Sequence, residues 1–203
     1  NYSSTTGITA GLNPTVVANY KGGTNGQGAT GANARIGTES FVSKADSPLI
    51  YLSYAEAKFM EAEANYILAG GNATSTGTNA AANAAYLEGI SANMDKIGVA
   101  AAAKNAYVAD LSINKGIANL QLKDIMRQKF IALYLNPETF TDYRRYDFST
   151  NVFANLTLPP NVDPLNAGKW MRRFVYSTNE KSANSAIYLA NFKPMTTPVW
   201  WDL

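Results

Sequence analysis

The chain has 203 residues, of which 46% are hydrophobic and only 16% are charged, and its formal net charge is +2. This length can bury one sizeable core, and the small net charge excludes a surface that follows nucleic-acid phosphates, so no nucleic-acid partner is expected. Because the sequence contains neither cysteine nor histidine, it excludes disulfides, thiol nucleophiles, His-based triads and zinc sites of His and Cys.

The N-terminal stretch, residues 1–47, is rich in Gly, Asn, Thr and Ser and is predicted to form irregular loops, with a short strand at 15–18. The run 26–31 matches the spacing G-x-G-x-x-G of a dinucleotide-binding loop. That site requires a strand before the loop and a helix after it, and the polar sequence around this run predicts neither. We interpret the run as a glycine-rich loop and expect no cofactor.

The first helix is predicted to begin at Ser53, where Ser53 and Glu56 match a capping box, and to stop at 70–71, a pair of glycines. Its apolar residues fall on two faces. One face carries Ala55, Phe59, Ala62, Tyr66 and Ala69, and the other carries Met60, Ala64 and Ile67. A helix that is apolar on two sides is predicted to lie between neighbouring elements.

Further helices are predicted over 79–97, 99–109 and 119–135, and a short one from Pro137 to about residue 144. The core stripe of the helix over 119–135 is predicted to be Leu122, Ile125, Met126, Lys129, Phe130, Leu133 and Tyr134. From residue 146 onward, prolines and polar residues predict a long ordered coil. The expected organisation is an irregular arm (1–47), a helical core (48–145) and an extended coil packed on the helices (146–203).

Carboxylates are the acid–base groups that remain in a chain without His or Cys. Glu56, Glu61 and Glu63 share one predicted helix, whereas a glycosidase needs two carboxyls that face each other across the sugar. We interpret them as a solvated edge. The segment 140–145, FTDYRR, is interpreted as a structural ion-pair cluster. The arginine pairs 144–145 and 172–173 are interpreted as partners in salt bridges and as caps of helix ends. No catalytic residue and no metal ligand is predicted.

With so few charges, the polar surface must come from Asn, Ser, Thr, Gly and Tyr, which suit neutral, hydroxylated ligands. Trp170, Tyr20 and Tyr2 are the aromatic residues most expected in exposed loops, where sugar-stacking platforms belong. They are the candidate ligand-binding residues, with ordinary packing as the alternative for each. The closing Trp200-Trp201-Asp202 is interpreted as an anchor for the C-terminus, with sugar stacking as its alternative.

Five blocks occur in an order that resembles the C-terminal region of the SusD/RagB-like family of bacterial outer-membrane nutrient-binding proteins. They are YLSYAEAKFMEAEANYILAGG (51–71), AAYLEGISANMDKIGV (84–99), QKFIALYLNPETFTDYRRYDF (128–148), MRRFVYSTNE (171–180) and TPVWWDL (197–203). The resemblance covers residues 35–203. Phe140 and Tyr143 stand where the family would be expected to carry tryptophans, which suggests a smaller packed cluster.

The resemblance implies an all-α fold in which tetratricopeptide-like helix pairs support long irregular coils. It implies a non-catalytic protein of Bacteroidetes-type bacteria that captures an oligosaccharide, or sometimes a peptide, and hands it to a SusC-like TonB-dependent transporter. Such proteins are lipid-anchored at the surface of the outer membrane, so we expect a missing N-terminal part of the same protein to carry the anchor. Two alternatives remain: a helical-repeat scaffold for protein–protein contact and a carbohydrate-active enzyme.

Overall fold

The computed structural model describes residues 22–24, 26–27, 40–162 and 164–202. Over these residues the chain is helical and forms no strand, which confirms the predicted all-α class. The helices are α1 (Tyr54–Leu68), α2 (Ala80–Lys96), α3 (Ala101–Ala109), α4 (Leu122–Ala132), α5 (Glu138–Arg145), α6 (Thr178–Ala183) and α7 (Ser185–Asn191), with a 3₁₀ turn at Pro164–Asn166. The candidate residues Tyr2 and Tyr20, the strand expected at 15–18 and most of the glycine run lie outside the described residues.

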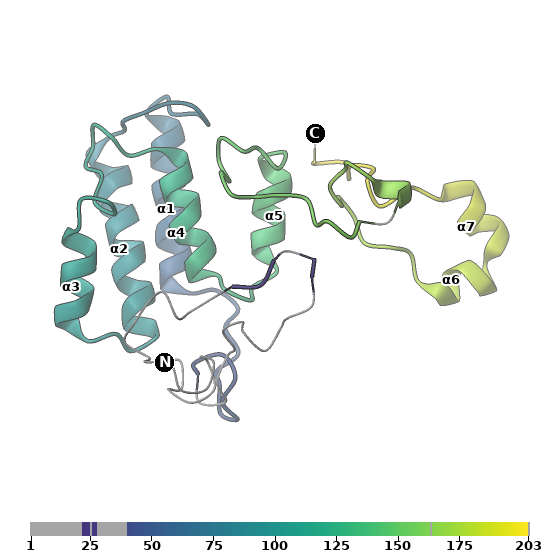
Figure 1. Cartoon of the computed structure of the whole chain (residues 1–203), viewed down its shortest axis with the longest axis horizontal. Helices are drawn as coiled ribbons and strands as arrows, with labels where there is room; N and C mark the ends of the chain where they lie inside the picture. Colours follow the sequence, from purple (N-terminus) through teal and green to yellow (C-terminus); the bar gives the residue numbers. More distant parts are fainter. Residues whose placement is uncertain (1–21, 25, 28–39, 163, 203) are drawn as a thin grey trace.

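Helices α1 to α4 form a bundle in which neighbours run in alternating directions, and α5 lies beside it (Figure 1). The first two helices begin at side-chain caps. The Ser53 hydroxyl accepts the Glu56 N–H at 3.1 Å, and the Asn79 side chain accepts the Ala82 N–H at 2.8 Å. Each cap satisfies one of the backbone donors that a helix start leaves free. These contacts confirm the helix starts predicted from the sequence.

The core lies where α1 packs along α2 and α4. Gly89 of α2 allows the close approach, because a Cβ atom at this position would lie 3.1 Å from the ring of Phe59. Tyr66 and Tyr86 are fully buried, and each hydroxyl donates to a loop carbonyl, at 2.7 and 3.0 Å. The other buried apolar residues of this core are Ala55, Ala62, Ala82, Ala85, Ile90, Leu120, Leu122, Ile125, Met126, Ala132 and Val152.

One side of α1 differs from the prediction. Met60, Ala64 and Ile67 are exposed, so the prediction that both apolar faces are covered was wrong for the part of the chain that the structure describes. The physical reason is that α2 and α4 both pack on the side that carries Phe59 and Tyr66. The second apolar face of α1 is therefore left accessible.

Helix α4 is shorter than the predicted span 119–135. It begins after a reciprocal cap, in which the Gln121 N–H donates to the Asp124 carboxylate at 3.0 Å. It ends before Leu135, whose φ of 65° lies in the left-handed region. Most of its predicted core stripe is buried, but Phe130 and Tyr134 are exposed and were wrongly assigned to the core.

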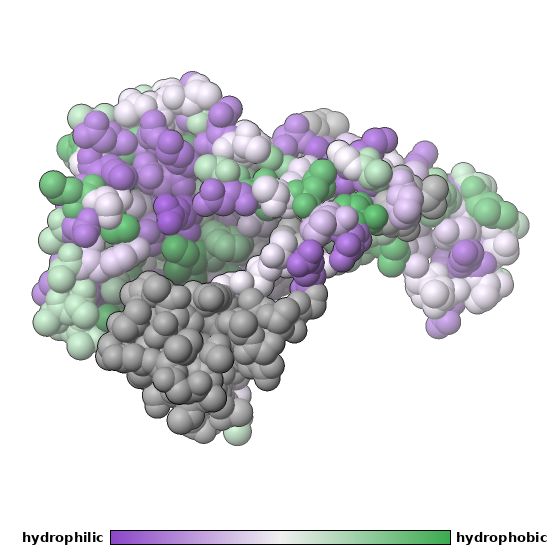
Figure 2. Space-filling model, in the orientation of Figure 1, coloured by the Kyte–Doolittle hydropathy of each residue, from purple (hydrophilic) through white to green (hydrophobic). Residues whose placement is uncertain are grey.

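The C-terminal segment contains two short helices that the sequence analysis treated as coil. Helices α6 and α7 stand at the end of the molecule opposite the bundle and bury none of their own residues (Figure 1). Figure 2 shows apolar side chains gathered at this end, where Ile187 and Leu189 are exposed. Among the helices of the described residues, none combines the length and apolarity that a membrane crossing requires.

Candidate ligand-binding site

A strained turn after α5 sets up the aromatic surface of the C-terminal segment. Asp147 and Phe148 have φ values of 50° and 52°, in the left-handed region that non-glycine residues seldom adopt. The turn reverses the chain and places the Phe148 ring, which is buried, 6.3 Å from Tyr143 of α5. The two left-handed residues thus aim Phe148 and Asp147 at the chain that returns from residue 170.

Trp170 stacks face to face on Phe148. The two ring centroids are 4.9 Å apart and the ring planes differ by 2°, while the Trp170 side chain is half-buried. The guanidinium of Arg172 lies 5.3 Å from the centroid of the Phe148 ring. The structure therefore places Trp170 in a supported stack that remains partly accessible, and ligand binding by Trp170 stays a prediction.

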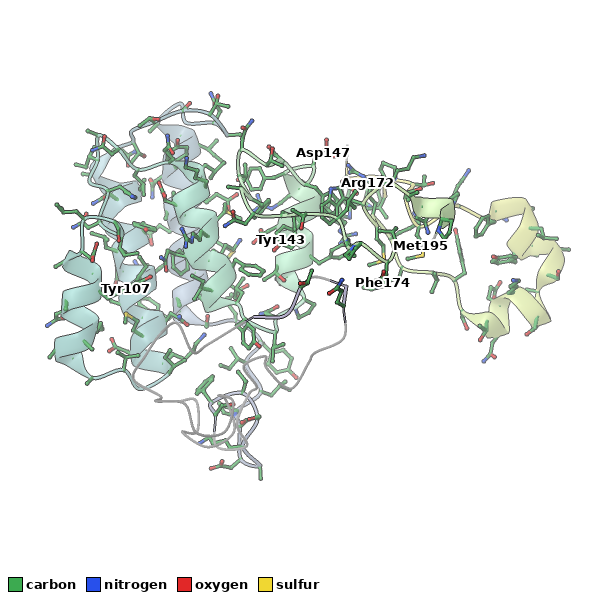
Figure 3. The ribbon with its side chains drawn as sticks, in the orientation of Figure 1. Tyr107, Tyr143, Asp147, Arg172, Phe174 and Met195 are labelled. Carbon is green, nitrogen blue, oxygen red and sulfur yellow. The ribbon has the colours of Figure 1, made fainter. Side chains whose placement is uncertain are left out.

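Arg172 joins three parts of the chain. One terminal nitrogen lies 2.6 Å from the Asp202 carboxylate, and the other binds the Asp147 carboxylate. The backbone carbonyl of Arg172 accepts a hydrogen bond from Arg144 of α5 at 3.0 Å. Figure 3 shows Asp147 and Arg172 directed toward one another where the C-terminal segment meets α5. The predicted salt bridges are thus confirmed for Arg172 and also for Arg145. Arg144 and Arg173 instead donate to backbone carbonyls within the described residues.

The terminal WWD motif divides into an anchor and an exposed aromatic residue. Asp202 is 1% exposed and Trp201 lies under the guanidinium of Arg144, which is 4.4 Å from its ring centroid. Trp200, by contrast, is 87% exposed, so its assignment to the anchor was wrong. Adjacent residues in an extended or turning segment point in different directions, which is why one tryptophan packs and the other does not. Trp200 is therefore a second accessible aromatic surface, and sugar stacking, the alternative to anchoring, stays open for it.

A network of charged side chains, most of them buried, joins α1, α4 and α5. Lys129 lies 2.9 Å from Asp142 and 3.7 Å from Glu63, and Arg145 reaches the same two carboxylates at 2.7 and 2.6 Å. The hydroxyl of Tyr146 also donates to Glu63. The ion-pair cluster predicted for 140–145 is confirmed, and it extends to α1. The interpretation of Glu56 and Glu63 as a solvated edge was wrong, since both are buried.

The electrostatics of this network oppose acid catalysis. Burial alone would raise the pKa of Glu63, but hydrogen bonds from Arg145 and Tyr146 and the charges of Arg145 and Lys129 outweigh it, and the net pKa is lowered. A glycosidase acid needs the opposite shift, because it must hold a proton at neutral pH. The pKa of Tyr146 is raised by burial and by its bond to Glu63. Within the described residues no group of three acidic side chains could hold a metal ion.

Comparison with protein families places the chain in a known family. A family model named SusD-like and described as starch-binding associating with outer membrane matches residues 5–177. The match contains the whole helical bundle, the strained turn and Trp170, and it ends at the residue before α6. A search among curated proteins finds no match.

Proposed function

The chain belongs to the SusD-like family of starch-binding proteins that associate with the outer membrane, and from this premise we propose that it binds an oligosaccharide nutrient without altering it. We propose further that it delivers the sugar to a SusC-like TonB-dependent transporter. The observation that carries the proposal is the stack of Trp170 on Phe148, with ring planes within 2° of parallel. A flat, fixed aromatic ring suits the apolar face of a pyranose and loses little conformational entropy on binding.

The buried carboxylates of the bundle support binding without catalysis. The buried carboxylates of Glu63 and Asp142 share two cationic partners, Lys129 and Arg145. For Glu63 the hydrogen bonds from Arg145 and Tyr146 and the nearby positive charges lower the pKa, which stabilises the anion and disfavours proton donation to a leaving group. The arrangement is that of a structural network, and we assign it the role of holding α1, α4 and α5 together.

The exposed apolar side chains at one end of the bundle support the proposal of a partner protein. They lie before and at the start of α1 and at the end of α4, and they are Leu49, Tyr51, Leu52, Tyr54, Phe130, Tyr134 and Leu135. Because α1 and α4 run in opposite directions, these two stretches lie at the same end (Figure 1). A clustered apolar surface favours contact with another polypeptide, either the transporter or a further part of the same protein.

The same reasoning extends to organisation and location. We propose that residues 48–145 are a tetratricopeptide-like scaffold, with an irregular arm before it and with the C-terminal segment, apart from α6 and α7, packed onto it. We place the protein on the surface of the outer membrane of Bacteroidetes-type bacteria, held by a lipid on a further N-terminal part of the same protein. Polysaccharide utilisation is then the process it serves.

The experiment that tests the sugar site compares binding of a maltooligosaccharide to the unaltered chain and to Trp170→Ala, by isothermal titration calorimetry. We expect the substitution to weaken binding about tenfold or more, since stacking of one aromatic ring on a ligand contributes on the order of 1–3 kcal/mol. Trp170→Phe keeps an aromatic face and is expected to retain most of the affinity.

The melting temperature separates a ligand role from a packing role. Because Trp170 is only half-buried, we expect Trp170→Ala to lower it by a few degrees at most. A large thermal loss together with unchanged binding would show that Trp170 is a packing residue. Loss of binding in Trp200→Ala, with Trp170→Ala unaffected, would move the site to the exposed Trp200.

A further inference from the structure

A groove runs between α1 and α5, with Lys129 of α4 at its floor. It has a volume of about 370 Å³, which is within the range of small-molecule sites. Residues 56–67 of α1 form one wall and residues 138–145 of α5 form the other. The lining residues are Glu56, Met60, Glu63, Ala64, Ile67, Lys129, Glu138, Thr141, Asp142 and Arg145.

Glu56 stands out among the charged residues of this groove. It is only 6% exposed, yet its Oε2 atom accepts no hydrogen bond from the described part of the chain. The contrast with Glu63 is sharp, because Arg145 donates to both oxygens of Glu63, at 2.6 and 3.0 Å. A buried carboxylate oxygen without a donor is costly, and a ligand that donates to it would remove that cost.

Among the described residues, no cation forms an ion pair with Glu56. Lys96 of α2 is close enough for the charge of Glu56 to act on it, but its ammonium donates to the carbonyl of Ala132 at 3.0 Å. Lys129 is engaged with Asp142 and Glu63. The terminal torsion of a glutamate is soft, so rotation of the carboxylate can present either oxygen to the groove.

The charge balance of the lining selects the sign of the ligand. Four carboxylates line the groove, those of Glu56, Glu63, Glu138 and Asp142, against two cations, Lys129 and Arg145. The excess of two negative charges favours a cationic ligand and disfavours phosphate, sulfate and uronic acids.

The α1 wall supplies an apolar surface next to these charges. Met60, Ala64 and Ile67 line the groove and are exposed to solvent. An amphipathic ligand therefore fits best, with one apolar face for this wall and one positive donor for Glu56. A hexose ring that carries a protonated amine has both features.

From these observations we infer that the groove between α1 and α5 is a binding site for amino-sugar oligosaccharides, in which Glu56 receives the protonated amine of one ring. This inference rests on the proposed sugar-binding function and adds to it a second site with a preference for cationic sugars. Trp170 stacks on Phe148 beyond α5 and is not among the lining residues. The two sites can therefore be tested separately.

The test measures calorimetric affinity of the full 203-residue chain for three probes: a glucosamine tetramer, the neutral N-acetylglucosamine tetramer and tetralysine. We expect the glucosamine tetramer to bind most tightly, and Glu56→Gln to weaken it about tenfold, the usual size of a charged hydrogen bond. The amide has nearly the same shape, and the backbone contact of Glu56 with Ser53 is kept. Glu61→Gln, on an exposed carboxylate of α1 that pairs with Lys58, is the control and should leave the affinity unchanged.

A second variant tests the location of the site. Ala64→Phe fills the groove from an exposed position of α1, so it should abolish binding of the glucosamine tetramer while leaving the melting temperature near that of the unaltered chain. Equal affinity for the neutral tetramer, tighter binding of tetralysine, or full affinity in Ala64→Phe would each overturn the inference. A maltooligosaccharide that binds through Trp170 in all of these variants would leave the proposed function intact even if the groove proved empty.

Discussion

At the scale of single residues, Lys129 shows how burial changes the contribution of an ion pair to stability. Its ammonium lies 2.9 Å from Asp142 and is buried, whereas Lys58 lies at the same distance, 2.9 Å, from Glu61 on the surface of α1. Equal distances do not mean equal contributions to stability, because water screens the surface pair and the buried carboxylates have no such substitute partner. Comparison of Lys129 with Lys58 therefore tests the effect of burial on an ion pair at constant distance.

We predict that Lys129→Met lowers the free energy of unfolding by about 3 kcal/mol, since it leaves buried carboxylates with one cation in place of two. Lys58→Met removes a surface cation that also lies near two carboxylates, Glu61 at 2.9 Å and Glu88 at 3.1 Å, and should leave the unfolding midpoint close to that of the unaltered chain. Urea denaturation of both variants is the measurement. Similar midpoints for the two would show that the network around Glu63 does not contribute through burial.

The lowered pKa of Glu63 predicts how stability depends on pH. A carboxyl whose pKa is lower in the folded protein stabilises the fold above its unfolded pKa, near 4.3, and this contribution is lost as pH falls through the folded pKa. The melting temperature should thus decline as the medium is acidified below that range. Glu63→Gln carries no titrating group and should show a smaller decline over the same interval, although it starts from a lower melting temperature. Parallel curves would contradict the assignment.

At the scale of elements, local signals predicted the helices well where they had a cap or a stop. Ser53 and Asn79 mark the starts of α1 and α2, and glycines follow both ends. One feature was wrongly predicted because it depends on other parts of the chain. The face of α1 that carries Met60 and Ile67 looks like core by its spacing, yet no described element covers it.

Helices α6 and α7 were missed for a different reason. With 6 and 7 residues and no buried side chain, they have no apolar periodicity to detect. Helices this short are marginal alone, and an aromatic cluster supports them: Tyr188 lies 5.7 Å from Tyr176 and 5.4 Å from Phe192. The stack of Trp170 on Phe148 could not be predicted either. It depends on the left-handed backbone of Asp147 and Phe148, which are not glycines, so the sequence carries no signal for this turn.

The cap of α1 gives a prediction at this scale. Ser53→Ala removes the acceptor of the Glu56 N–H and should lower the free energy of unfolding by about 1 kcal/mol. Ser53→Asp keeps an acceptor at the same position and should restore most of the loss. Chemical denaturation monitored by circular dichroism measures both, and equal losses in the two variants would show that the cap contributes nothing.

On the scale of the whole molecule, a helical bundle and a C-terminal segment are joined by arginines. Arg144 stacks on Phe140 and Trp201, at 4.5 and 4.4 Å, and Arg172 ties Asp147 to the buried Asp202. The junction holds the aromatic surface at Trp170 beside α5, and the groove lies between α5 and α1. The bundle and the C-terminal segment thus present two different surfaces, one aromatic and one acidic, and the pKa of Glu63 in the acidic groove is lowered by its hydrogen bonds and by nearby positive charges.

The proposed function requires that the protein bind a sugar and release it chemically unchanged. The most direct measurement incubates the purified chain with a maltooligosaccharide, determines its affinity by calorimetry and then analyses the recovered sugar by mass spectrometry. We predict saturable binding and recovery of the intact oligosaccharide alone. Shorter oligosaccharides that accumulate with time and with protein concentration would contradict the account.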